Sequence, residues 1–176
     1  MKTSRITRIA LFTALMAVSV WVVPPFSVPG LGVPFTLQSL FVVLAGFLLA
    51  PVEAFVAMLA YLALGAAGLP VFSGGQGGLQ VILGPTGGFL LLFPAVAATI
   101  ASFREKSDKI WVWILLGFIV AVVFLYPLAV IWTSVVTQTA YGVLLVGMIP
   151  YAIMDVLKIV IAAFLSRKID RALHHE

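Results

Sequence analysis

The sequence predicts an all-α integral membrane protein, a single bundle of about six transmembrane helices. Its composition is the first reason: 63% of the 176 residues are hydrophobic, 9% are charged, and the mean hydropathy is +1.23. A soluble domain carries roughly a quarter of its residues charged. The second reason is that proline, glycine and charged residues divide the chain into apolar stretches that approach the roughly 20 residues needed to cross a bilayer.

Three predicted spans occupy the first part of the chain, and each ends where proline or glycine interrupts an apolar run. They cover residues 6–23, 36–50 and 52–68. Pro24 and Pro25 follow the first span, and Pro51 separates the second from the third. The second span is short for a crossing, so we expect little tilt or a locally thin bilayer there.

Three further spans cover residues 85–103, 110–137 and 148–166. The fourth begins at Pro85, a residue well suited to the first turn of a helix. The fifth is long and contains Pro127, which removes one backbone hydrogen bond and predicts a kink. All six spans belong to one transmembrane domain that covers residues 1–176.

Basic residues predict how the spans are oriented. Nine of the ten form three clusters: Lys2, Arg5, Arg8; Arg104, Lys106, Lys109; and Arg167, Lys168, Arg171. Cytoplasmic loops are enriched in lysine and arginine, and six crossings from a cytoplasmic N-terminus place all three clusters and the C-terminus in the cytoplasm. The outer loops, residues 24–35, 69–84 and 138–147, contain no charged residue. The pattern predicts a multi-pass protein of the inner (cytoplasmic) membrane, and it argues against a nucleic-acid partner.

The three outer loops are rich in glycine and proline. They contain Pro24, Pro25, Pro29, Gly30, Gly32 and Pro34 in the first loop, the run Ser73-Gly74-Gly75-Gln76-Gly77-Gly78 in the second, and Gly142 and Gly147 in the third. Glycine lets a backbone approach a ligand closely, and such loops also move as lids. The same residues make plain turns between helices, so both interpretations stay open at this point.

Asp155 and Lys158 are the most informative pair in the chain. They lie inside the sixth span, and their i, i+3 spacing places them on one helical face. Ionisable groups within a bilayer are costly, so they usually face a cavity or a partner and mark a functional path. The pair therefore predicts a ligand site in the outer half of the bundle. The alternative is an ion pair that only fastens one helix to its neighbours.

Neutral polar groups lie at the N-terminal ends of two other spans. Thr36 and Gln38 begin the second span, where Thr36 serves either as a ligand contact or as the helix N-cap. The run Gly84–Phe89 opens the fourth span, where free N–H groups suit an anionic ligand group. A tight helix start explains this run equally well.

Ala10 and Ala14 form a small-xxx-small pair near the inner end of the first span. This spacing lets another helix approach closely. From the spacing alone, we expect packing within the chain.

Catalysis and metal binding are not expected. The chain has no cysteine, no histidine within a span and no pair of carboxylates in one span, whereas an enzyme needs a nucleophile with a base, or a metal. His174 and His175 form a polar tail, and two adjacent histidines without other ligands make a poor metal site. The run at residues 84–89 lacks the Gly-Lys-Ser/Thr ending of a P-loop.

Taken together, four motifs resemble the BioY family, the biotin-specific substrate-binding subunits of energy-coupling-factor (ECF) importers. They are Val33-Pro34-Phe35-Thr36-Leu37-Gln38, Gly68-Leu69-Pro70-Val71-Phe72 with the glycines that follow, Gly84-Pro85-Thr86-Gly87-Gly88-Phe89, and Asp155-Val156-Leu157-Lys158. Any one motif is weak, but their order and spacing make the set specific. The resemblance covers residues 5 to 167, nearly the whole chain.

The resemblance implies a six-helix bundle that binds biotin in an outward-facing pocket. Its partners would be a transmembrane coupling (T) subunit and two cytoplasmic ATPases, which alone hydrolyse ATP, so no cofactor is expected on this chain. Asp155 and Lys158 match the acid and base that line the vitamin site of the family. Ala10 and Ala14 match the small-residue face that contacts the coupling subunit in related proteins.

The expected biotin site combines the charged pair with loop and wall residues. Its members are Asp155, Lys158, Tyr151, Phe89, Ser73, Gly74, Gln76, Thr36 and Gln38. Two positions depart from the family pattern. Relatives often carry Tyr where this chain has Phe89, and some have Asn where it has Gly74. A ring hydroxyl contact and a side-chain bond to the ligand would then be absent.

Biotin fits the charged pair chemically, because its ureido ring offers two N–H donors and one carbonyl acceptor. We expect Asp155 to accept from an N–H and Lys158 to donate to the carbonyl, while backbone N–H groups of the Gly-rich loops bind the carboxylate. Two alternatives remain from the sequence: a related subunit for another vitamin such as riboflavin or thiamin, and a membrane scaffold that binds no ligand.

Overall fold

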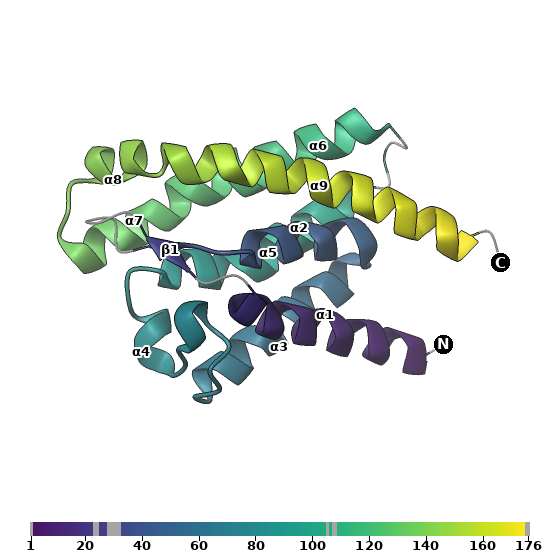
Figure 1. The fold of residues 1–176 in the computed structure, drawn as a ribbon, viewed down its shortest axis with the longest axis horizontal. Coiled ribbons are helices and arrows are strands. Elements are labelled where there is room, and N and C mark those ends of the chain that lie inside the picture. Colours follow the sequence, from purple (N-terminus) through teal and green to yellow (C-terminus); the bar gives the residue numbers. More distant parts are fainter. Residues whose placement is uncertain (1, 23–24, 28–32, 105, 107–108, 175–176) are drawn as a thin grey trace.

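The computed structural model describes residues 2–22, 25–27, 33–104, 106 and 109–174, and within this part of the chain it is almost entirely helical. Its elements are α1 (Lys2–Val22), β1 (Phe26–Ser27), β2 (Pro34–Phe35), α2 (Gln38–Leu48), α3 (Pro51–Ala66), η1 (Ser73–Gly75), α4 (Leu79–Ile82), α5 (Gly87–Arg104), α6 (Ile110–Phe118), η2 (Ile119–Phe124), α7 (Leu125–Thr137), α8 (Tyr141–Gly147) and α9 (Ile149–His174). Figure 1 shows both termini at one end of the bundle, the terminal end, and β1, α4 and α8 at the opposite end, the loop end.

Among the described residues, four helical stretches are long and apolar enough to cross a membrane. They are Ser4–Val22, Gly87–Arg104, Ile110–Thr137 and Ile149–Ala172. The helices α2 and α3 are also apolar, but they are shorter. At about 1.5 Å per residue, the 11 residues of α2 reach only about half of a hydrocarbon core of about 30 Å. The short second span was therefore foreseen correctly.

The predicted ends of several spans are wrong by a few residues. The first helix begins at Lys2, before its predicted start, and the second and third end at Leu48 and Ala66, before theirs. The largest error is in α9, which continues to His174, whereas the predicted span stopped at Ser166. A span predicted from hydropathy stops at the first basic cluster. The backbone continues because lysine, arginine and alanine are good helix formers.

The loops predicted on the outer face contain more structure than expected. Residues 69–84 include η1 and α4, and residues 138–147 include α8. In the first loop, β1 and β2 pair antiparallel, with Phe26 opposite Phe35 and Ser27 opposite Pro34, which is a small exception to the all-α prediction. Pro24, Pro29, Gly30 and Gly32 lie outside the described residues.

The irregularity expected at Pro127 takes the form of a π-helical turn. The segment η2 (Ile119–Phe124) interrupts the helix that runs from Ile110 to Thr137 and ends three residues before the proline. A proline ring clashes with the carbonyl four residues earlier, here that of Val123. Wide π turns are among the identified causes of helix irregularity.

The core sits where α2, α3 and α5 pack together, with α1 against α3 and α9 against α2. Gly46 of α2 lets α5 approach closely: a Cβ at this position would lie 2.7 Å from Cβ of Ile100. Close approach at glycine is typical of helix pairs within membranes. Because α9 and α2 pack side by side (Figure 1), residues near the start of α2 face residues in the first half of α9.

Charged side chains tie helices together at the terminal end. Glu53, at the start of α3, is buried; its carboxylate accepts from Arg8 at 3.0 Å and lies 3.6 Å from Arg5. Arg104 of α5 lies 3.8 Å from the carboxylate of Asp170 on α9 and donates to the carbonyl of Phe47. By contrast, the loop residues 69–84 and 138–147 carry no charge.

Candidate functional site

A cavity of about 710 Å³ opens near the loop end, within the range of small-molecule sites. Its wall comes from five parts of the chain: Pro25, residues 33–39 around β2 and the start of α2, the segment from Phe72 to Phe93, Leu125 and Tyr126 on α7, and residues 148–158 from the end of α8 into α9. Aromatic and aliphatic side chains make up much of it, and few of its groups are charged.

Asp155 and Lys158 are the charged groups of this wall. Each is only 6% exposed. Lys158 Nζ donates to Asp155 Oδ1 at 2.7 Å, one turn along α9. The structure thus combines the two alternatives raised by the sequence, because the two side chains pair with each other and also border a cavity.

The ammonium group of Lys158 has an acceptor for each of its three protons. Besides Asp155, it donates to the backbone carbonyl of Thr36 at 2.6 Å and to Ser39 Oγ at 2.9 Å. It also lies 3.8 Å from the centre of the Phe35 ring, a cation–π contact. A lysine has only three donors, so a ligand that accepts from Lys158 must replace one of these partners.

The carboxylate of Asp155 retains an acceptor site. Its Oδ1 accepts from Lys158 and from Ser39 Oγ at 2.8 Å, whereas Oδ2 accepts, among the described residues, only from the hydroxyl of Tyr126, at 2.8 Å. Each carboxylate oxygen has two lone-pair sites. Asp155 Oδ2 is therefore the atom of the pair best able to accept a further hydrogen bond from a ligand N–H.

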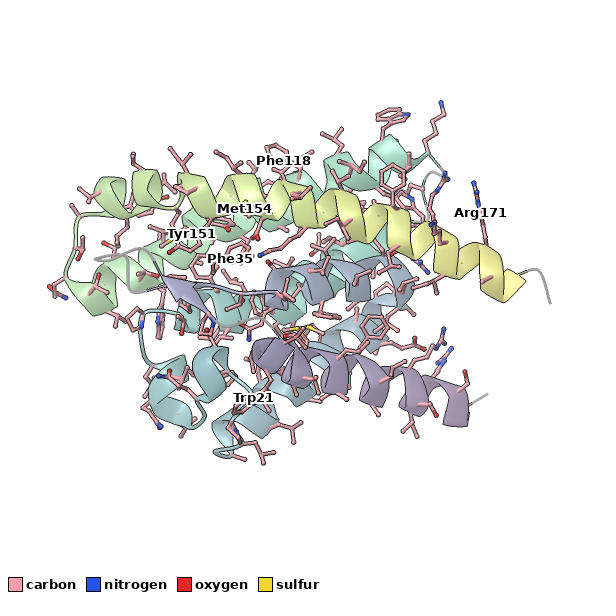
Figure 2. All side chains as sticks on the ribbon, viewed as in Figure 1. Trp21, Phe35, Phe118, Tyr151, Met154 and Arg171 are labelled. Atoms are coloured by element: carbon pink, nitrogen blue, oxygen red, sulfur yellow. The ribbon has the colours of Figure 1, made fainter. Side chains whose placement is uncertain are left out.

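All nine residues that the sequence predicted for the site border this cavity. They are Asp155, Lys158, Tyr151, Phe89, Ser73, Gly74, Gln76, Thr36 and Gln38. The Phe89 ring meets Tyr126 edge to face at 5.4 Å, and the Tyr151 ring lies 6.4 Å from that of Phe35. Figure 2 shows Phe35 and Tyr151 near each other beside α9.

Thr36 has several roles at once. Its hydroxyl accepts from the backbone N–H of Gln38 at 3.3 Å, although the N-cap position itself belongs to Leu37, and it donates to Gln38 Oε1 at 3.0 Å. Its carbonyl accepts from Lys158. The residue therefore organises the start of α2 and also orients the charged pair.

The Gly-rich segment offers a polar atom with no partner among the described residues. Ser73 Oγ is buried and makes no hydrogen bond, and Ser73 borders the cavity. The next residues, Gly74 and Gly75, have φ of +72° and +71°, in the left-handed region that favours glycine. This backbone turns Ser73 and Gly74 towards the cavity without a side-chain penalty.

Three residues that contact the charged pair were not among the predicted site residues: Tyr126, Ser39 and Phe35, of which Phe35 stands within the motif at residues 33–38. The phenol of Tyr126 bonds Asp155 directly, and Ser39 bridges Asp155 and Lys158. A tyrosine inside a predicted span is a usable signal, because a buried hydroxyl in a bilayer needs a partner. Ser39 lies one residue beyond the motif that ended at Gln38.

Ala10 and Ala14 lie away from the cavity, on an exposed face of α1. Packing within the chain, expected from their spacing alone, is therefore wrong for these two residues. Their side chains face outward, where a second molecule has access.

No metal site is present in the described part of the chain, since no three His, Cys, Asp or Glu side chains come together there. His175 lies outside the described residues, as does the side chain of His174.

Comparison with known proteins places this geometry in a family. The sequence profile of the BioY family matches residues 1–175. The chain belongs to the BioY family. It is 34% identical to the biotin transporter BioY of Thermotoga maritima, over 95% of this chain and 96% of that protein. It is 33% identical to the biotin transporter BioY2 of Lactococcus lactis, over 97% of this chain and 92% of that protein.

A solved structure of a biotin S-component has the same fold. The crystal structure of the S-component for biotin from an ECF-type ABC transporter superposes with a TM-score of 0.92 and 26% sequence identity. The match covers 97% of this chain and 92% of that one. The resemblance to the BioY family, drawn from four short motifs, is confirmed.

Proposed function

We propose that this chain captures biotin from outside the cell, as the substrate-specific S-component of an ECF-type transporter. The observation that carries the proposal is the buried pair of Asp155 and Lys158 on the wall of a cavity of about 710 Å³, in a chain of the BioY family. Related chains described as biotin transporters align over nearly the whole length. The family assignment agrees with the expectation of a transport subunit and not an enzyme.

Asp155 Oδ2 is the proposed acceptor for a ureido N–H of biotin, because Oδ1 already has two donors. Lys158 donates to the ureido carbonyl after giving up one of its three present acceptors. Of these, the Thr36 carbonyl is the one that ligand binding most easily replaces. The carboxylate keeps the ammonium neutralised, and Ser39 keeps both members of the pair in place.

The remaining parts of biotin meet an apolar wall and the Gly-rich segment. Phe89, Tyr151 and Phe35 supply aromatic surface for the fused rings and the aliphatic chain. The proposed donors to the ligand carboxylate are the backbone N–H groups of Ser73, Gly74 and Gly77 together with the hydroxyl of Ser73, because the N–H groups of Gly75 and Gln76 already donate to the Phe72 carbonyl. Thr36 and Gln38 complete the polar edge near the start of α2.

The proposed topology has six crossings: α1, α2, α3, α5, the continuous helix from α6 to α7, and α9. Both termini lie at the same end (Figure 1), as an even number of crossings requires. Arginines of α1, α5 and α9 gather at that end, which is cytoplasmic by the positive-inside rule. The cavity then faces the outside of the cell.

The proposed partners are a transmembrane coupling subunit, two cytoplasmic ATPases and membrane lipid. The described chain offers the coupling subunit the exposed face of α1 with Ala10 and Ala14, because small residues let two helices approach closely in a bilayer. ATP is hydrolysed only by the partner ATPases, and this chain needs no cofactor of its own.

Competition binding to the purified full chain tests the proposal. Labelled biotin should bind and be displaced by unlabelled biotin, but not by riboflavin or thiamin. Asp155→Asn should weaken binding at least tenfold, because a charged acceptor is lost. Asp170→Asn is the matched control, since it makes the same change at the terminal end. Displacement by riboflavin or thiamin, or full affinity in Asp155→Asn, would overturn the proposal.

A further inference from the structure

Residues 71–77 form one wall of the cavity, and hydrogen bonds join this segment to α3. Val71 and Phe72 precede η1, and the Phe72 N–H donates to the carbonyl of Gln76 at 2.9 Å, which closes a tight loop. The N–H of Gly78 donates to the carbonyl of Gly65 on α3 at 2.7 Å. The segment therefore depends on α3 for its position, and it contains Ser73, Gly74 and Gln76 of the proposed biotin site.

Phe72 anchors this wall through its ring. The side chain is fully buried, and its ring meets that of Tyr61 edge to face with centroids 5.6 Å apart. Beneath it lies Gly65, where an added Cβ would lie 2.1 Å from the Phe72 ring. Only glycine leaves space for this ring, so Gly65 and Tyr61 together form its socket.

Tyr61 also fastens the same wall through its hydroxyl. The residue is fully buried in α3, and its O–H donates to the carbonyl of Val71 at 3.0 Å. The same oxygen accepts from the amide of Gln38. Gln38 in turn accepts from the hydroxyl of Thr36 at 3.0 Å, and the Thr36 carbonyl accepts from Lys158. One chain of hydrogen bonds thus joins the charged pair on α9 to the wall on α3.

We propose that Tyr61 is a positioning residue for ligand retention, which holds the cavity wall at residues 71–77 over the bound molecule. It acts through Val71 and Phe72 and does not itself border the cavity. Through Gln38 and Thr36 it also connects this wall to Lys158, the group that must exchange a partner when a ligand arrives. This inference rests on the proposed function, because the ligand it retains is biotin.

The positioning role differs in a measurable way from a purely structural one. A residue that only stabilises the fold would, when changed, raise amide hydrogen exchange throughout the bundle. A residue that positions one wall raises exchange locally. The amides of Phe72, Gly75, Gln76 and Gly78 are suitable reporters, because each is hydrogen-bonded in this structure.

The test compares Tyr61→Phe with Tyr141→Phe in the full chain. Both remove one tyrosine hydroxyl, but that of Tyr141 is exposed and lies 3.4 Å from the Pro127 carbonyl, away from the cavity. Tyr61→Phe should speed the release of labelled biotin roughly fivefold, as expected for the loss of one buried hydrogen bond. It should also speed exchange at residues 72–78 while the amides of α5 and α9 stay as in wild type. Tyr141→Phe should change neither quantity.

A second variant displaces the same wall at residues 71–77 without removing any polar group. Gly65→Ala places a methyl group inside the Phe72 ring position and keeps the Tyr61 hydroxyl. It should reproduce the faster biotin release and the local exchange at residues 72–78. An unchanged release rate in Tyr61→Phe, or exchange raised equally in every helix, would overturn the positioning role.

The two measurements distinguish a failure of biotin binding from a failure of the positioning role of Tyr61. The exchange measurement is made on ligand-free protein, so it decides whether Tyr61 and Gly65 position the wall, whatever the ligand is. If wild type does not bind biotin, the proposed function falls while that result stands. If wild type binds biotin and Tyr61→Phe releases it at the wild-type rate, the positioning role alone falls.

Discussion

Lys158 Nζ lies 2.7 Å from Asp155 Oδ1 on the wall of the cavity, with both side chains only 6% exposed. Each charge is compensated by the other, and Ser39 and Thr36 supply the remaining partners of the ammonium group. The pair is therefore stable in a bilayer without a ligand. It nonetheless keeps one acceptor position on Asp155 Oδ2, and this combination underlies the proposed biotin site.

Breaking the pair on one side should cost more stability than replacing both members. Lys158→Met leaves the carboxylate buried without its counter-ion and should lower the unfolding free energy by about 3–5 kcal/mol. The double variant Asp155→Leu with Lys158→Met should lose much less, because no charge remains uncompensated. Thermal unfolding in detergent measures both. Equal stabilities for the single and double variants would show that the two charges do not depend on each other.

Tyr126→Phe should weaken biotin binding roughly tenfold, because the phenol donates a hydrogen bond of 2.8 Å to Asp155 Oδ2 and bonds to charged groups contribute about 1.5–3 kcal/mol. Without this donor, the carboxylate is free to turn away from the ligand. Equilibrium binding is the measurement, with Tyr141→Phe as the matched control. Wild-type affinity in Tyr126→Phe would contradict the assigned role of Oδ2.

Ser73→Ala should weaken binding only of a ligand that carries a carboxylate. The Ser73 hydroxyl is buried without a partner among the described residues, so its removal should leave the ligand-free protein at least as stable as wild type. Biotin should bind roughly fivefold more weakly, whereas biotin amide, which lacks the carboxylate, should bind as it does to wild type. Equal losses for both ligands would show that Ser73 does not contact the carboxylate.

Gly46→Ala should destabilise the bundle, because its Cβ would lie 2.7 Å from Cβ of Ile100 at the contact of α2 and α5. Overpacking of this kind costs about 1–3 kcal/mol. Gly142→Ala is the matched control, since nothing lies within 4 Å of an added Cβ there. Thermal unfolding in detergent compares the two. A Gly46→Ala variant as stable as Gly142→Ala would mean that the two helices pack less closely than described.

Ala14→Trp should uncouple binding from uptake. Ala14 lies on the exposed face of α1, away from the cavity, so biotin affinity of the purified chain should remain at the wild-type value. Uptake by cells that also contain the coupling subunit and ATPases should fall strongly, because a large side chain prevents close helix approach. Unimpaired uptake would place the coupling surface elsewhere on the chain.

The charged pair was predictable from the sequence because ionisable residues stand out within an apolar span. The spacing of Asp155 and Lys158 fixes their common face once the segment is helical. The order of spans was also predictable, since proline, glycine and basic residues mark their ends. Hydropathy does not report where a helix ends in water, so α9 was predicted too short.

The remaining partners depend on contacts between distant segments. Ser39 and Tyr126 meet Asp155 only because α2, α7 and α9 converge at the loop end. The hydrogen bonds from Lys158 to Thr36 and Ser39 could not be predicted from a single sequence, because they form only when α2 packs on α9. The socket of Phe72 likewise forms only when residues 71–77 fold back on α3.

A solved structure of the full chain with biotin bound tests the central claim most directly. The account predicts a ureido nitrogen about 3 Å from Asp155 Oδ2, a ureido oxygen next to Lys158 Nζ, and loss of the present contact between Lys158 and the Thr36 carbonyl. Biotin bound elsewhere, or bound in the cavity with the partners of Asp155 and Lys158 unchanged, would contradict it.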